Sequence, residues 1–207
     1  MGDSKTGASI TDDFLIRMLK GCVQLGYYPM IDNTINMVPV DHVARIVVAS
    51  GVYPANTVAG SVGTVQVQPQ PRLSWSDFLS TLSQYYHVKS ESYDAWRQRL
   101  LRYVEQGDGE EFAALPLLDL LTGDFVAATT ERLLQNENAV TALKRDGVNP
   151  QSGSSVTKEL VALYLGYLKQ IGFMPAETKE ALPEVKIGEE QMMALKGLVG
   201  RGAVART

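Results

Sequence analysis

The sequence predicts a mostly α-helical domain with a few short strands, of the α+β class. Apolar residues recur at helical spacing over most of the chain, and only short stretches are typical of strands. In residues 36–50 an apolar stretch with Pro39 inside it leads into a helical stripe. We expect a strand at Met37–Val40, at a sheet edge because proline cannot donate to a ladder, and then a helix capped by Asp41. This segment should join the helical part of the chain to a sheet.

Composition excludes several classes of protein. Of 207 residues, 45% are hydrophobic and 20% are charged, which indicates a globular domain. A formal net charge of -4 without a long basic run argues against nucleic-acid binding. The single cysteine, Cys22, excludes an intrachain disulfide and a cysteine-cluster zinc site. The sequence shows neither an apolar signal core nor a membrane-spanning run, so we expect a cytoplasmic protein without a membrane partner.

The first ten residues predict a loop. Gly2 and Gly7 have the spacing of a phosphate-binding loop, but Ala8 stands where that loop requires lysine. We therefore interpret the stretch as a surface loop. A helix should begin at Thr11 and end at Gly26, followed by a turn at Tyr27–Pro29.

The rest of the chain is predicted from stripes and caps. Val43, Ile46 and Val47 continue the helix after Asp41, and alternation at Thr64–Gln68 predicts a half-buried strand. The later helices are expected from Ser74 or Ser76 to Tyr85, at Ser92–Gln106, at Ala139–Arg145 with Asn138 as cap, at Val156–Ile171 and at Glu189–Leu198. Glu110–Leu121 should be helical with a kink at Pro116 or divided there into two shorter helices, and Asp124–Gln135 should be a short helix or a mobile loop.

A search for chemistry finds no complete catalytic set. The two histidines, His42 and His87, belong to no cluster with metal-ligand spacing, so we expect no metal site. The sequence has no G-x-S-x-G nucleophile elbow and no G-x-G-x-x-G dinucleotide loop. Tyr85 and Lys89 have Tyr-x-x-x-Lys spacing but follow the Trp75 helix, so we interpret the pair as a chance match. No residue of this chain is therefore assigned a catalytic role.

Specific strings carry a resemblance that periodicity does not. GDSKTG (2–7), TDDFLIRMLKGCVQLGYYP (11–29) and NMVPVDHVARIVVAS (36–50) together resemble the region just after the Rossmann half of thioester reductase domains, which are extended short-chain dehydrogenase relatives. RLSWSDFL (72–79), NAVTALKRDG (138–147) and LYLGYLKQIGFMP (163–175) are similar to strings of the fungal α-aminoadipate reductases (aminoadipate-semialdehyde dehydrogenases). One departure is Pro69-Gln70, where the family often has Gly-His.

The resemblance implies the C-terminal, substrate-binding portion of an NADPH-dependent reductase. Such an enzyme releases a carrier-bound aminoadipoyl thioester as the semialdehyde in lysine biosynthesis. NADPH and the Tyr-Lys pair would be held by residues upstream of Met1, so this chain alone would be inactive and without a cofactor. Residues 1–68 would rejoin the upstream Rossmann sheet, and residues 69–207 would form a helical substrate-binding lid. The implied partners are the upstream Rossmann half and a phosphopantetheinyl carrier domain.

The resemblance also implies a pocket wall. The residues expected to line it are Gly2, Asp3, Ser4, Lys5, Val38, Pro39 and Asp41. Arg97, Arg99 and Arg102 are candidates to meet an acidic carrier helix, although a solvated helix face is the simpler interpretation. The alternative is a stand-alone helical module that docks a carrier protein without chemistry. A dinucleotide loop and a Tyr-x-x-x-Lys pair upstream would distinguish the reductase from this module.

Overall fold

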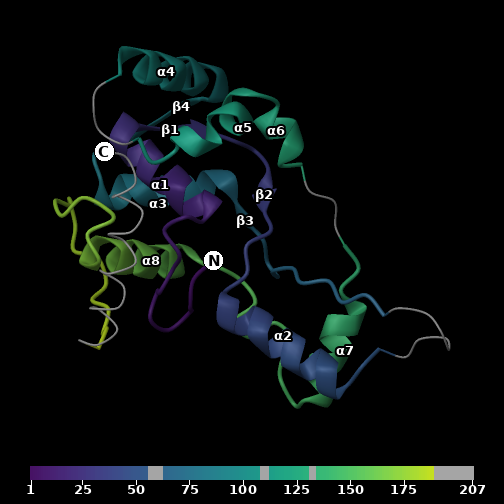
Figure 1. The fold of residues 1–207 in the computed structure, drawn as a ribbon. Coiled ribbons are helices and arrows are strands. Elements are labelled where there is room, and N and C mark those ends of the chain that lie inside the picture. The colour runs from purple at the N-terminus through teal and green to yellow at the C-terminus, as the bar shows by residue number, and fades with distance from the viewer. Residues whose placement is uncertain (56–62, 108–111, 131–133, 189–207) are drawn as a thin grey trace, which may run out of the picture.

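The computed structural model describes residues 1–55, 63–107, 112–130 and 134–188 (Figure 1). The helices are α1 (Phe14–Leu25), α2 (Val40–Val52), α3 (Trp75–Tyr85), α4 (Tyr93–Gln106), α5 (Leu118–Thr122), α6 (Phe125–Ala128), α7 (Glu137–Arg145) and α8 (Lys158–Gln170), with a 3-10 turn, η1, at Leu115–Leu117. The strands are β1 (Tyr27–Met30), β2 (Thr34–Ile35), β3 (Leu73–Ser74) and β4 (Lys89–Ser92). The predicted class, mostly helical with a few short strands, is confirmed.

The strands form two small sheets. β1 pairs in parallel with β4, with Tyr27 opposite Lys89, and β2 pairs antiparallel with β3. Trp96 of α4 supports the first sheet because its indole N–H donates to the Tyr27 carbonyl at 3.1 Å. None of the helices within the described ranges has the length and apolar character needed to cross a membrane.

Two separate hydrophobic clusters hold these elements together. The larger one gathers the inner faces of α1, α3, α4 and α8, including Leu19, Phe78, Leu100 and Tyr164. Trp75 is buried in it, as the sequence predicts. The smaller cluster joins α2 to α7 through Ile46, Ala49, Ala139, Ala142 and Leu143. Figure 1 shows α2 and α7 side by side, set apart from the other helices.

The two strands predicted at Met37–Val40 and Thr64–Gln68 are both wrong. Val40 already belongs to α2, and Pro39 is the N-cap residue, without a side-chain cap bond. Asp41 therefore does not cap the helix. Residues 64–68 pair with no strand in the described part of the chain. Their alternation arises because Val65 and Val67 pack against the α2–α7 cluster from one side.

Several boundaries also differ from the predictions. α1 begins at Phe14 rather than Thr11, because the Asp13 carboxylate caps it by accepting from the Leu15 and Ile16 amides. The predicted turn at Tyr27–Pro29 is wrong, since these residues form β1. Gly26 does end α1, with a φ of 71°.

In the second half, Asn136 occupies the N-cap position of α7, while the Asn138 amide donates to the Thr64 carbonyl at 2.7 Å. The predicted interruption at Pro116 is confirmed, because η1 and α5 replace one continuous helix. The expected helix at Glu189–Leu198 lies outside the described residues.

Candidate functional site

The glycine-containing loop of residues 2–9 closes tightly on itself. The Asp3 amide donates to the Ala8 carbonyl at 2.9 Å, and the Gly7 amide donates to the Asp3 carbonyl at 3.0 Å. The Asp3 carboxylate accepts from the Lys5 and Thr6 amides at 3.0 and 2.8 Å. The loop forms because the short side chain of Asp3 brings its carboxylate within reach of the backbone amides two and three residues ahead.

Gly7 allows the loop to press against α8. Its φ is 69°, a left-handed conformation that side chains rarely adopt. A Cβ added there would lie 2.7 Å from the Leu163 carbonyl oxygen, so the close approach also requires glycine.

Asp41 clasps the loop to the start of α2. The Ser4 hydroxyl donates to Asp41 Oδ2 at 2.8 Å, and the Ser4 amide donates to Oδ1 at 3.0 Å. The Gly2 carbonyl accepts from the Val40 amide at 3.2 Å and from the Tyr164 hydroxyl at 3.1 Å. The loop is therefore fixed to α2 and to α8 at the same time.

These contacts shift the pKa values of two ionisable groups at the site, Asp3 and Tyr164. Burial would raise the pKa of the Asp3 carboxyl, but hydrogen bonds from Thr6 and Lys5 outweigh it and hold that pKa below its usual range. Burial raises the pKa of the Tyr164 hydroxyl, and the negative charges of Asp41 and Asp3 raise it further. Tyr164 is therefore a neutral hydrogen-bond donor at physiological pH.

The loop offers no cradle for a phosphate. Every backbone N–H from Asp3 to Ala8 already has an acceptor within the loop or on Asp41. At the start of α2, the Val40, His42 and Val43 amides are also bonded to backbone carbonyls. Because a phosphate loop works through free amides, these residues do not fit the pyrophosphate of a dinucleotide.

Two hollows flank the site, and both are lined in part by Met1 and Asp13. The smaller, of about 100 Å³, is also lined by Gly2, Ser9, Ile10 and Val40. The larger, of about 380 Å³, is lined by the apolar Phe14, Met37, Val38 and Val43 and by the polar Asn36. Its wall therefore offers both apolar and polar groups to a bound molecule.

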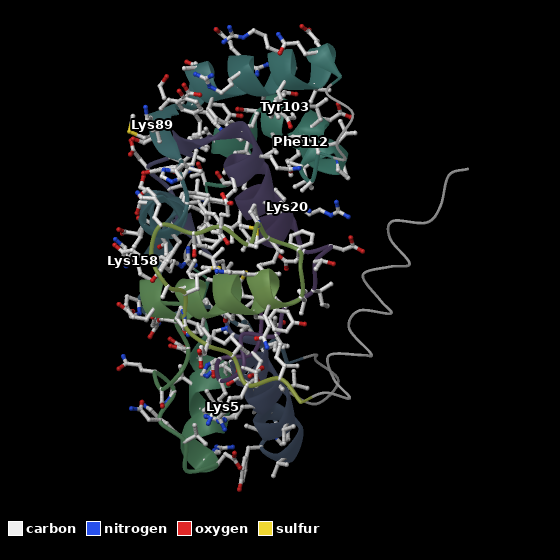
Figure 2. The ribbon with its side chains drawn as sticks, turned by 90° about the vertical axis from the view of Figure 1, so that its left-hand side faces the viewer. Lys5, Lys20, Lys89, Tyr103, Phe112 and Lys158 are labelled. Atoms are coloured by element: carbon white, nitrogen blue, oxygen red, sulfur yellow. The ribbon has the colours of Figure 1, made fainter. Side chains whose placement is uncertain are left out.

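The structure brings together most of the residues expected at the pocket wall. Asp3, Ser4 and Asp41 form one bonded unit, Gly2 and Val38 line the hollows, and Pro39 is buried at the start of α2. Lys5 differs because its side chain is exposed. Figure 2 shows it at the end of the molecule that holds α2 and α7, away from the end where Tyr103 lies.

Sequence reasoning missed Tyr164 and Asn36 as members of this site. Tyr164 was assigned to the packing face of α8, and its bond to Gly2 spans 162 residues, so no local pattern signals it. Tyr85 and Lys89 lie on different elements, α3 and β4, so their spacing is not that of one helix face. Among the described residues, no three His, Cys, Asp or Glu side chains could hold a metal ion together.

Known proteins resemble this chain along nearly its whole length. A model of an NAD-binding family, described as male sterility protein, matches residues 1–47. The L-2-aminoadipate reductase large subunit of Penicillium chrysogenum is 44% identical over 217 residues, covering 99% of this chain. L-2-aminoadipate reductases of Schizosaccharomyces pombe and Saccharomyces cerevisiae are 43% and 41% identical, covering 98% and 99% of it. Over nearly its whole length, this chain is therefore similar to one segment of the L-2-aminoadipate reductases. It spans only 14–15% of the length of these relatives.

Solved structures agree with the family in fold. The terminal R domain from the myxalamid biosynthetic pathway superposes with a TM-score of 0.66 at 24% identity, covering 86% of this chain and 43% of that one. The reductase domain of a nonribosomal peptide synthetase from Mycobacterium tuberculosis gives 0.65 at 16% identity, covering 84% and 45%. This chain thus has the fold of part of a reductase domain, as the resemblance implied.

Proposed function

We propose that this segment is the C-terminal, substrate-binding part of an NADPH-dependent thioester reductase that works in the cytoplasm. The enzyme would release a carrier-bound aminoadipoyl thioester as the semialdehyde, a step of lysine biosynthesis, and the segment alone would be inactive. The observation that carries the proposal is 44% identity over 99% of the chain with the Penicillium reductase. In such an enzyme the cofactor, held outside this chain, would supply a hydride for the thioester carbonyl carbon, and the carrier would leave as a thiolate that takes up a proton.

Within that enzyme the two parts of the chain would have different roles. We propose that residues 1–68 rejoin the upstream Rossmann sheet, which the match of residues 1–47 to an NAD-binding family supports. Residues 69–207 would supply the helical substrate-binding part. This division concerns roles rather than separate cores, because α1 shares one hydrophobic cluster with α3 and α8.

The pocket wall would be the clasped loop and the segment that leads into α2. Gly2, Asp3, Ser4 and Lys5 belong to the loop, and Val38, Pro39 and Asp41 belong to the segment. Asp41 accepts a hydrogen bond from Ser4, and Tyr164 donates one to the Gly2 carbonyl, so the wall would be held in place before substrate binds. This reduces the entropic cost of ordering the wall on binding. The larger hollow would take the aliphatic part of the acyl group.

NADPH would be held mainly by residues outside this chain. The loop amides and those of Val40, His42 and Val43 are already bonded, so they leave the pyrophosphate to a dinucleotide loop elsewhere in the enzyme. The cofactor would supply the hydride. The Tyr-Lys pair that protonates the alkoxide and positions the nicotinamide ribose would also lie upstream.

A phosphopantetheinyl carrier domain is the partner that the reaction requires. Of the three α4 arginines considered for its docking, Arg99 is already committed. It forms a bidentate pair with Glu91, at 2.8 and 3.2 Å, and lies 3.7 Å over the Tyr27 ring. Arg97 and Arg102 remain exposed, but Asp94 and Glu105 lie on the same helix. The α4 surface is therefore of mixed charge, and we assign no docking site to it.

The test is NADPH oxidation by the longer protein that carries this chain, with a carrier-bound aminoadipoyl thioester as substrate. We expect activity, and we expect Asp41→Asn to lower kcat/KM by about 10- to 100-fold because it loosens the wall. Asp12→Asn makes the same change at an exposed carboxylate outside the site and should leave the rate near normal. Carrier binding without NADPH oxidation would instead indicate a docking module.

A further inference from the structure

Helix α2 is apolar on two opposite sides, and only one of them is covered. His42, Ile46 and Ala49 are buried toward α7 and its loops. On the other side, apolar residues and one glycine recur at Val40 and at 4, 7, 8, 11 and 12 residues after it. We call this side the valine face, and it consists of Val40, Ala44, Val47, Val48, Gly51 and Val52.

The valine face is open along its whole length. The exposed fractions of Val40, Val47, Val48 and Val52 are 51%, 64%, 64% and 61%. A Cβ added to Gly51 would meet nothing within 4 Å. At 3.6 residues per turn these positions span roughly 140° of the helix circumference. A helix that is apolar on both sides is typical of one that is buried on both sides.

The apolar surface continues from α2 toward the candidate site. Ile10 is 76% exposed, and it lines the smaller hollow together with Val40. An exposed apolar surface of this kind marks a place where another part of a protein binds.

Comparison with solved reductase domains indicates what that part is. This chain covers only 43% and 45% of the two R-domain chains, so more than half of each has no counterpart here. The match to the NAD-binding family includes Val40, Ala44 and Val47 and ends inside α2. The first turns of this helix therefore belong to the region shared with NAD-binding proteins.

We propose that the valine face packs against the NAD-binding part of the same reductase domain, which lies outside this chain. The inference rests on the proposed function for the identity of the partner, and it assigns the contact to one face of one helix. Small side chains allow the backbone of α2 to approach closely, so the partner surface should be apolar and without charged groups at its centre. The same contact would cover Ile10 and complete the wall beside the smaller hollow.

The decisive test is photo-cross-linking in the longer protein that carries this chain. A benzophenone amino acid replaces Val48 and, as a matched control, Leu120, which is 45% exposed on α5. We expect the Val48 probe, and not the Leu120 probe, to cross-link within one chain to the NAD-binding part. Cross-links between two copies, cross-links to the carrier domain, or no cross-link at all would overturn the proposal.

A second measurement separates packing from catalysis. Val47→Asp with Val48→Asp should leave the thermal unfolding midpoint of this chain alone unchanged, because both side chains are mostly exposed in it. In the longer protein the same pair should speed amide exchange in α2 at least tenfold, whereas Leu120→Asp should not. An unchanged exchange rate would contradict the inference. Because neither readout uses NADPH or a thioester, failure of the proposed reaction would leave this result interpretable.

Discussion

Asp41 shows how a local sequence pattern can assign the wrong structural role to a residue. The sequence predicts an acidic N-cap there, but Pro39 occupies the cap position, and both Asp41 oxygens bind Ser4 instead. Thirty-seven residues separate Asp41 from Ser4, so no local pattern shows the bond. The resemblance implies a place for both residues at a pocket wall, which stays a prediction, and the structure shows that the two residues are bonded to each other.

A comparison of Gly7 with Gly147 separates the backbone strain of a side chain at positive φ from the steric clash of its Cβ. Gly7→Ala must adopt a φ of 69° and also clash with the Leu163 carbonyl at 2.7 Å. Gly147→Ala must adopt a φ of 75° but meets nothing within 4 Å. We expect Gly147→Ala to lower the free energy of unfolding by about 1 kcal/mol and Gly7→Ala by about 2–4 kcal/mol. Urea unfolding measures both, and equal losses would show that α8 does not confine the loop.

His42 gives a prediction about pH. Burial lowers the pKa of its imidazole, and Arg45 lowers it further, while a hydrogen bond with the Ser152 backbone and the charge of Asp41 act in the opposite direction. The Nδ1 atom is buried without a partner among the described residues, so the ring is accommodated as the neutral form. The folded chain therefore binds the proton less readily than the unfolded chain does.

Stability from His42 should be fully present above the unfolded pKa of about 6.5 and should be lost as the pH falls through the lower folded pKa. We expect the urea midpoint to drop as the pH falls below about 6.5, and His42→Gln to flatten that drop. His87→Gln makes the same substitution at an exposed histidine and serves as the matched control. If the urea midpoint depended on pH equally in the unmodified chain, His42→Gln and His87→Gln, His42 would not be its cause.

At the scale of elements, the helices could be predicted because their signals are local. Ser74, one of the two caps predicted for α3, does cap that helix, because a hydroxyl needs only an amide three residues ahead. Ser92, predicted as the first residue of its helix, caps α4 in the same way. The strands could not be predicted in the same way. β1 looked like a turn because of Pro29, and its pairing depends on β4, about sixty residues later in the chain. Alternation at Thr64–Gln68 signalled one-sided burial but not a partner strand.

Two helical glycines provide a matched prediction. Gly166 lies in the middle of α8, and a Cβ there would come within 2.4 Å of the Pro183 carbonyl. Gly166→Ala should therefore push the segment 182–185 away and cost about 1–3 kcal/mol, despite the better helix propensity of alanine. Gly51→Ala in α2 meets open space in this chain and should gain up to about 1 kcal/mol. Thermal unfolding of both variants, with amide exchange at 182–185, checks the pair. Stabilisation by Gly166→Ala would contradict the observed contact.

At the scale of the whole molecule, the two hydrophobic clusters predict unequal local stability. The α2–α7 cluster is built largely from alanines, whereas the main cluster contains Trp96, Phe78 and Tyr164. Amides of α2 and α7 should therefore exchange faster than those of α3 and α8. This division could not be predicted from the sequence, because the α2 stripe alone does not show which side meets α7.

Ile46→Ala tests that difference. It removes a buried side chain from the smaller cluster and should cost about 2 kcal/mol or more. Hydrogen exchange should accelerate in α2 and α7 and stay unchanged in α8. Leu79→Ala, in the main cluster, should accelerate exchange in all of these helices. Uniform acceleration by Ile46→Ala would show that the two clusters unfold as one.

The double attachment of the Asp3–Ala8 turn has a consequence for protein engineering. Because Asp41 ties that turn to the same helix that carries the valine face, the proposed acyl-binding wall and the proposed packing surface would move together as one piece. A hybrid enzyme with its junction between Ser9 and Val38 would combine a wall from one parent with a helix from the other. Junctions placed before Gly2 and after Tyr53 would keep the two together, so on this proposal an exchange of substrate preference between reductases would require both.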